Sequence, residues 1–157
     1  MEAILLKRLI SALFISLVII TQLVGCSGKT SVPITVVSVN KYIDTKGSQQ
    51  LNIIVKNTSQ EYTIKSAQVY VKCYSVKNTL LSDRANGQDV YACTYSQSEL
   101  APGQLSSDNL FFDYSGFDSI DSCKIAVKSV TLNDGTELSI ETENLDYLDF
   151  SIGTIEN

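Results

Sequence analysis

Residues 67–74 (AQVYVKCY) alternate apolar and polar side chains more regularly than any other stretch of the chain. Successive side chains of a β-strand point to opposite faces of the sheet, so a period of two indicates one buried face and one wetter face. The alternation therefore predicts a half-buried strand in an antiparallel sheet. Its buried set is Ala67, Val69, Val71 and Cys73, and its wetter set is Gln68, Tyr70, Lys72 and Tyr74.

The sequence around this strand has the same β texture, interrupted by clusters of turn-forming residues. Aspartate, asparagine, glycine and proline at residues 44–48, 100–104 and 133–135 predict turns. A longer polar loop is expected at residues 77–89, with a turn at Asn86-Gly87. The strands predicted between these turns are residues 32–39, 50–55, 67–74, 90–95, 110–114, 123–132 and 136–140.

About seven short strands without a long helical pattern predict an all-β fold, an antiparallel immunoglobulin-like β-sandwich. This sandwich is expected to occupy residues 32–141. An acidic tail at residues 142–157 follows, in which Leu145, Leu148 and Ile152 have near-helical spacing. The tail is expected to be a short helix docked on the sandwich or to be disordered.

The first 25 residues differ from the rest of the chain. Lys7 and Arg8 precede an almost continuous apolar run at residues 9–20, which is too short to span a bilayer comfortably. A charged start followed by a short apolar core predicts a secretory signal peptide. The next residues resemble, position by position, the lipobox of bacterial lipoproteins: Leu23-Val24-Gly25-Cys26.

The lipobox resemblance implies removal of residues 1–25 by cleavage after Gly25 and transfer of a diacylglycerol to the sulfur of Cys26. Acyl chains such as palmitate anchor a protein firmly, because each buried CH₂ contributes about 0.8 kcal/mol and two chains suffice. Residues 26–31 would be a lipidated tether, and the protein would lie outside the cytoplasm on the bacterial cell membrane. The alternative is an uncleaved membrane helix with a chance cysteine.

Composition narrows the functions open to the domain. The chain has 12 basic and 17 acidic residues and no histidine; without Lys7, Arg8 and Glu2 the mature form has 10 and 16, a net charge near −6. This balance argues against nucleic acid as a partner. Catalytic triads that use histidine are excluded, and zinc is not expected because no Cys-x-x-Cys pair exists. We expect no cofactor and no enzymatic activity.

Several short motifs resemble the Ig-like domains of Gram-positive surface lipoproteins, such as the FxLYD type. They are the run ending in Val-Lys-Asn-Thr-Ser at residues 55–59, the strand entry at residues 64–67, the Leu-Ala-Pro-Gly turn at residues 100–103 and the hairpin at residues 134–136. The resemblance covers about residues 34–141 and implies a fold rather than an activity. The 77–89 loop is longer than the tight turn of those domains, and three cysteines are unusual.

Three cysteines remain beyond Cys26, an odd number that leaves at least one thiol without an internal partner. A loop centred near residue 83 would place Cys73 opposite Cys93, close enough for a disulfide. Cys123 is the alternative partner of Cys73, since both lie on apolar strand faces. The absence of any bridge, with buried inert thiols, is the third possibility.

Two further groups of residues are candidates for binding. Tyr70, Lys72 and Tyr74 share the wetter face of their strand, and tyrosine is favoured at interfaces. The 77–89 loop is a second contact surface. Carboxylates between residues 108 and 121 offer oxygen ligands for calcium, but their spacing matches no calcium loop and a solvated turn is the preferred interpretation: Asp108, Asp113, Asp118 and Asp121.

These observations favour a membrane-anchored, non-catalytic interaction or structural module of the cell envelope. Its partners would be the membrane, through the lipid, and an envelope protein or polymer. The alternative function is a receptor lipoprotein for a small molecule or an ion such as calcium, which would need a concave pocket with convergent polar groups.

Overall fold

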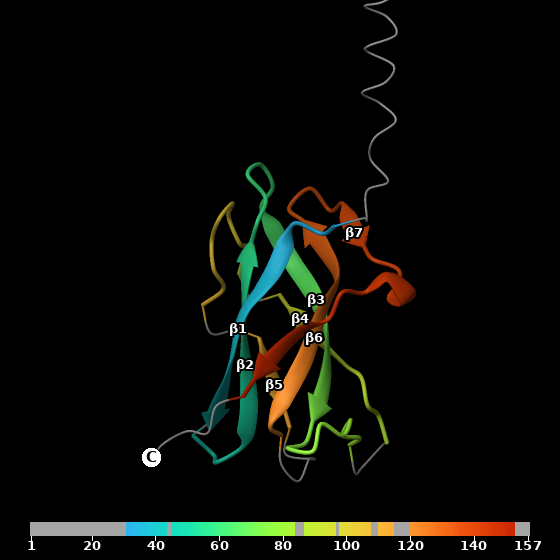
Figure 1. Ribbon diagram of the computed structural model, residues 1–157. Coiled ribbons are helices and arrows are strands. Elements are labelled where there is room, and N and C mark those ends of the chain that lie inside the picture. The colour runs from blue at the N-terminus through green and yellow to red at the C-terminus, as the bar shows by residue number, and fades with distance from the viewer. Residues whose placement is uncertain are drawn as a thin grey trace, which may run out of the picture. The chain divides into compact units, whose positions relative to one another are not determined.

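Antiparallel β-strands make up almost all the regular structure of the domain (Figure 1). The computed structural model describes residues 31–43, 45–83, 87–96, 98–107, 110–114 and 120–152, which belong to one unit that begins at Ser31. Their elements are β1 (Ile34–Ile43), β2 (Gln49–Asn57), β3 (Ile64–Tyr74), β4 (Tyr91–Tyr95), β5 (Phe111–Asp113), β6 (Ser122–Leu132), β7 (Glu137–Ser139), a 3₁₀ turn (Thr142–Asn144) and β8 (Leu148–Ser151).

The strands form two sheets, one with the order β1-β2-β5 and the other with the order β4-β3-β6-β7, in which β8 also pairs with β6. Every pairing is antiparallel. The all-β prediction is therefore confirmed, and the seven strands expected from the sequence are all present. Side chains from both sheets contribute to a single core, which gives the domain a sandwich-like architecture.

The period-two patterns explain which side chains fill this core. In β3 the buried and half-buried residues alternate as predicted, with Val69, Val71 and Cys73 inaccessible to solvent. In β2 the same rule buries Leu51, Ile53 and Val55. Burying an aliphatic side chain of this size contributes about 1.5–3 kcal/mol. Burial of the apolar side chains on the inner face of each strand therefore drives the packing of the two sheets.

Asn57, at the end of β2, is the main polar residue inside this core and is fully buried. Its side-chain amide donates hydrogen bonds to the carbonyls of Tyr62 and Leu100, at 2.8 and 2.9 Å. Its side-chain oxygen accepts a bond from the Ser59 amide at 2.9 Å. Asn57 therefore ties together the end of β2, the loop that follows it and the 100–104 turn.

The hairpin predicted at residues 133–135 joins β6 to β7. Gly135 has a φ of 88°, in the region that favours glycine, and the Leu132 amide donates to the Thr136 carbonyl at 2.9 Å. The carboxylate of Asp134 accepts a hydrogen bond from the Thr136 amide at 2.8 Å, which lowers the pKa of Asp134. The turn chemistry at this point therefore sets the register of the two strands.

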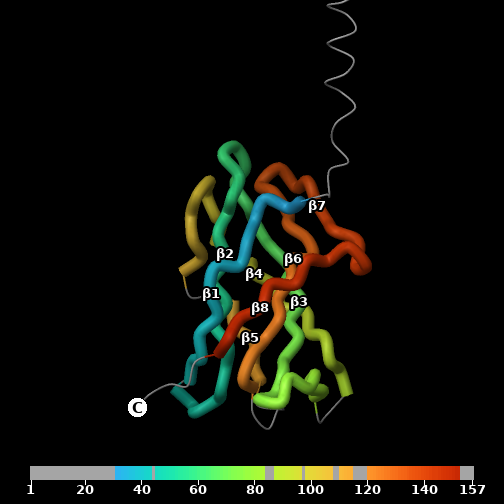
Figure 2. Tube along the Cα trace, viewed as in Figure 1, coloured from blue at the N-terminus to red at the C-terminus, as the bar shows by residue number. Residues whose placement is uncertain are grey.

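The tail differs from the helix or disordered segment expected for it. β8 pairs along β6, where Cys123 faces Phe150 and Ile125 faces Leu148. Figure 2 shows β8 following β6 on the side of the domain where β1 lies. Phe150 packs against the core and Ile152 is buried, so the apolar side chains of this segment follow the period of a strand rather than that of a helix.

The predicted opposition of Cys73 and Cys93 is wrong. Cys93 lies opposite Val69, and Cys73 lies opposite Cys123. The chain between β3 and β4 does not fold as a symmetric hairpin, because the Leu81 amide donates to the Cys73 carbonyl at 2.9 Å and Leu81 thereby takes the place beside Cys73. All three described cysteines are free thiols in the structure.

Candidate binding surface

The outer face of the larger sheet carries the three residues singled out from the sequence, Tyr70, Lys72 and Tyr74, on β3. The structure adds Lys124, which lies opposite Lys72 on β6, and Tyr147, which precedes β8. We call these five residues the Tyr–Lys face. All five side chains are half-buried, so each is anchored in the surface and still reaches solvent.

Contacts between rings and ammonium groups connect the members of this face. The Lys72 Nζ lies 4.3 Å from the centre of the Tyr147 ring, and the Lys124 Nζ lies 5.6 Å from the centre of the Tyr74 ring. Both distances are within the range of cation–π attraction. These contacts hold each lysine over a ring instead of leaving it extended into water.

Carboxylates lie next to two members of the face. Lys124 Nζ makes an ion pair with Asp149 at 3.2 Å. Burial raises the pKa of the Tyr147 phenol, and the nearby Tyr70, Tyr74 and Asp89 raise it further. Tyr147 is therefore neutral at physiological pH and offers a hydroxyl that can both donate and accept a hydrogen bond.

A hollow of about 600 Å³ opens beside Tyr70, Lys72 and Tyr147. Its position follows from the cross-strand register, because Tyr70 lies opposite Ala92 on β4, and the small alanine side chain leaves space beside the tyrosine ring. The rim also contains Gln88, Val90 and Thr142, so the end of the 77–89 loop borders the same hollow.

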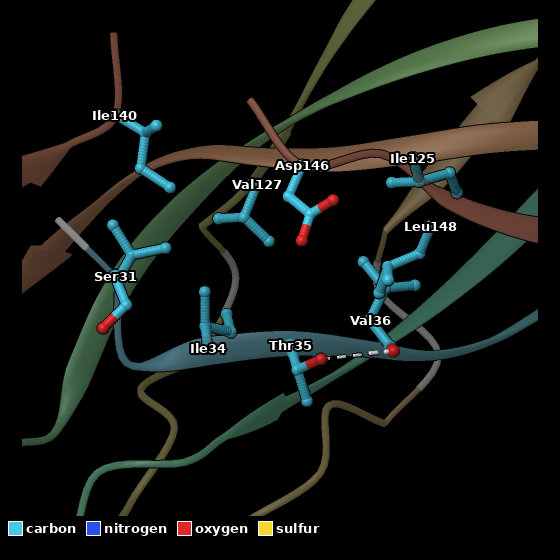
Figure 3. A pocket seen from close by; sticks show the side chains of 10 residues that line it. Ser31, Ile34, Thr35, Val36, Ile125, Val127, Ile140, Asp146 and Leu148 are labelled. Carbon is cyan, nitrogen blue, oxygen red and sulfur yellow. Dashed lines mark hydrogen bonds between the residues drawn. The ribbon is translucent and has the colours of Figure 1, made fainter. Parts of the chain in front are cut away.

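A smaller hollow of about 250 Å³ lies where β1 faces β6 and the start of β8 (Figure 3). In Figure 3 Ile34, Val127 and Ile140 point into it, and Asp146 is its one charged side chain. The hydroxyl of Thr35 on its rim donates to the Val36 carbonyl at 3.5 Å. This lining is mainly aliphatic, unlike the convergent polar groups that the receptor alternative requires.

The carboxylates proposed for calcium are only partly within the described residues. Asp113 lies on β5 and Asp121 just before β6, whereas Asp108 and Asp118 lie outside the described part of the chain. Within that part, no three side chains of the histidine, cysteine, aspartate or glutamate kind gather in a way that could hold a metal ion. The described residues thus give the calcium alternative no geometric support.

The segment predicted to be a signal peptide, the lipobox-like motif and Cys26 lie outside the described residues. Among the residues that are described, no helix is long and apolar enough to cross a bilayer. No family model matches this chain, and searches of curated proteins and of solved structures find no match.

Sequence analysis misses two members of the face, Lys124 and Tyr147. It places Tyr147 in a separate tail, because the near-helical spacing of Leu145, Leu148 and Ile152 indicates a short helix or disorder there. The signal that identifies β8 is the alternation of residues 148–152 (LDFSI), which sends Phe150 and Ile152 inward. Given that strand, the residue before it falls beside the outer face of β6, where Lys72 reaches it.

Proposed function

We propose that this chain is the precursor of a bacterial lipoprotein, anchored to the cell membrane through lipid on Cys26. In this proposal residues 1–25 are removed and the domain acts outside the cytoplasm as a non-catalytic interaction module of the cell envelope. The motif Leu23-Val24-Gly25-Cys26 supports the anchor. Since the mature chain is acidic, electrostatic adhesion to anionic lipid would contribute little and the acyl chains would supply the attachment.

We further propose that the domain is immunoglobulin-like. Constant-type Ig domains pair strands A, B, E and D in one sheet and strands C, F and G in the other, and variable-type domains add C′ beside C. The order β1-β2-β5 corresponds to A-B-E, and the order β4-β3-β6-β7 corresponds to C′-C-F-G. In this comparison the Tyr–Lys face is the outer surface of the C′-C-F-G sheet.

The observation that carries the binding role is the Tyr–Lys face itself. Tyrosines give large contact area at low entropic cost, and Lys72 supplies positive charge on a chain with net charge −5, whereas Lys124 is paired with Asp149. Such a surface suits a partner with anionic or hydroxyl-rich groups, such as an envelope polymer or an acidic segment of an envelope protein. The hollow between Tyr70 and Tyr147 would receive part of that partner.

Photo-crosslinking in the bacterial cell tests this role directly. A photoreactive amino acid at Ala92, which is exposed in the hollow, should give crosslinks to a wall-associated or protein partner. The same probe at Asn40, exposed on β1 in the other sheet, is the matched control. Equal labelling at both positions, or none at Ala92, would argue against a binding role for this face.

Substitutions sharpen the test. Lys72→Ala removes the ammonium group held over Tyr147 and should reduce crosslinking from Ala92 by about five- to tenfold, the loss expected for one charged contact of about 1–1.4 kcal/mol. Lys56→Ala, at an exposed position of β2, should leave crosslinking unchanged. Urea unfolding of both variants separates loss of binding from loss of folding.

A further inference from the structure

The register of β3 and β6 brings two buried cysteines directly opposite each other. Cys73 on β3 pairs with Cys123 on β6, and both side chains are inaccessible to solvent. Cys93 lies opposite Val69 instead, four residues from Cys73 along β3, or about 13 Å at the usual rise of a strand. Disulfides need Cα atoms within about 7 Å of each other, which excludes Cys93 as a partner of Cys73.

The hydrogen-bond pattern shows which kind of pair the two cysteines form. In an antiparallel strand the amide and carbonyl of one residue point to the same side. The Cys73 carbonyl accepts from the Leu81 amide, which lies on the side of β3 away from β6. The backbone groups of Cys73 therefore do not point to Cys123, the residue directly opposite it on β6.

Cys73 and Cys123 are therefore a non-hydrogen-bonded pair, in which neither residue bonds to the other through its backbone. Cα atoms in such pairs are about 4.5 Å apart, and the side chains are closer than in hydrogen-bonded pairs. That separation is at the short end of the range that a disulfide spans, about 4.4–6.8 Å. A bond between the two sulfurs would require little movement of either strand.

We infer that Cys73 and Cys123 form an intramolecular disulfide as the chain folds, and that Cys93 remains a free thiol. The bond would join β3 to β6 on the core side, next to the pair formed by Lys72 and Lys124 on the outer side. It would thus fix the spacing of the two strands that carry most of the Tyr–Lys face. The inference itself depends only on register and burial, not on the proposed binding role.

The bond is made by thiol–disulfide exchange with a protein or small-molecule disulfide as oxidant. One cysteine thiolate attacks that disulfide to give a mixed disulfide, and the second displaces the remaining sulfur. The two cysteines lose two protons and two electrons, and the oxidant is reduced to two thiols. Burial raises the pKa of Cys73 and of Cys123 to about 12, so the thiolates needed for exchange are scarce once the core has closed.

Refolding of the full chain carrying Cys26→Ser, which removes the fourth thiol, tests the inference. The chain is reduced, unfolded and refolded in a glutathione redox buffer, and free thiols are then alkylated in denaturant. Trypsin leaves Cys93 and Cys123 together in residues 85–124, so a second cleavage after Glu99 is needed to separate them. Mass spectrometry of the unreduced digest then identifies which cysteines are linked.

We expect a linked peptide containing Cys73 and Cys123, with Cys93 alkylated, and the same bond in the Cys93→Ala variant. Closing about 50 residues into a loop should raise the Tm by roughly 10 °C over the reduced protein. A bond that includes Cys93, three alkylated cysteines after refolding, or a bond that lowers the Tm would overturn the inference.

Discussion

Replacing Asn57 with alanine removes the polar centre of a junction on which three segments depend. The wild-type side chain satisfies the carbonyls of Tyr62 and Leu100 and the amide of Ser59. Each buried polar group left without a partner costs about 1–3 kcal/mol, and water can reach some of the partners from the exposed 58–62 loop. We therefore expect Asn57→Ala to lower the free energy of unfolding by about 3–4 kcal/mol.

Urea unfolding measures this loss. The chain has eight tyrosines and no tryptophan, so far-ultraviolet circular dichroism and tyrosine fluorescence are the suitable signals. Thr58→Ala is the matched control, because Thr58 is exposed and its backbone amide, which the substitution keeps, donates to the Pro33 carbonyl at 2.9 Å. Its effect should stay within about 0.5 kcal/mol. A loss below about 1 kcal/mol for Asn57→Ala would refute the idea that this residue holds the junction together.

Two further predictions concern the tail and the thiols. Ile152→Ala should lower the free energy of unfolding by about 2–4 kcal/mol, because the Ile152 side chain is in the core. Leu148→Ala, at a residue that is 42% exposed, should lower it by less than about 1 kcal/mol. Equal effects of the two substitutions in urea unfolding would show that the tail is not docked. In the reduced protein, burial raises the pKa of Cys73 and Cys123 from 9.0 to about 12 and that of Cys93 to about 11, so the unfolded chain loses these protons first. The free energy of unfolding of the reduced protein should therefore be unchanged below about pH 9 and should fall as the pH rises toward 12. The fall should be steeper than in the oxidised protein. Identical pH profiles of the reduced and oxidised proteins would contradict this prediction.

The strands were predictable because their side chains alternate. In β3 and β6 the alternation of apolar and polar residues is enough to separate a buried face from a wetter one. The residues Asp134-Gly135 are those that a tight hairpin turn needs. The boundaries of β1 and β2 extend beyond the predicted ones, since Lys41, Tyr42 and Gln49 pair across the turn without being apolar. Backbone pairing continues past the last buried side chain, and hydropathy does not report it.

Register and long-range pairing were harder to predict. The predicted position of Cys93 depended on the assumption of a symmetric loop between β3 and β4. The hydrogen bonds of the Leu81 amide and of the Tyr91 hydroxyl instead make this loop asymmetric. β8 was missed because five residues with one buried and one half-buried apolar side chain fit either a helix or a strand. Tyr147 could not be placed beside Lys72 until that strand was known, so only three of the five residues of the Tyr–Lys face came from the sequence.

The anchor proposed for this domain is a lipid on Cys26. Intact mass spectrometry of the protein purified from its native bacterial membrane tests it most directly. We expect a chain that begins at Cys26 and carries the added mass of a diacylglycerol, with or without a further acyl chain on the new amine. A chain that begins at Met1 with an unmodified Cys26 would contradict it and would make residues 9–25 a membrane helix instead.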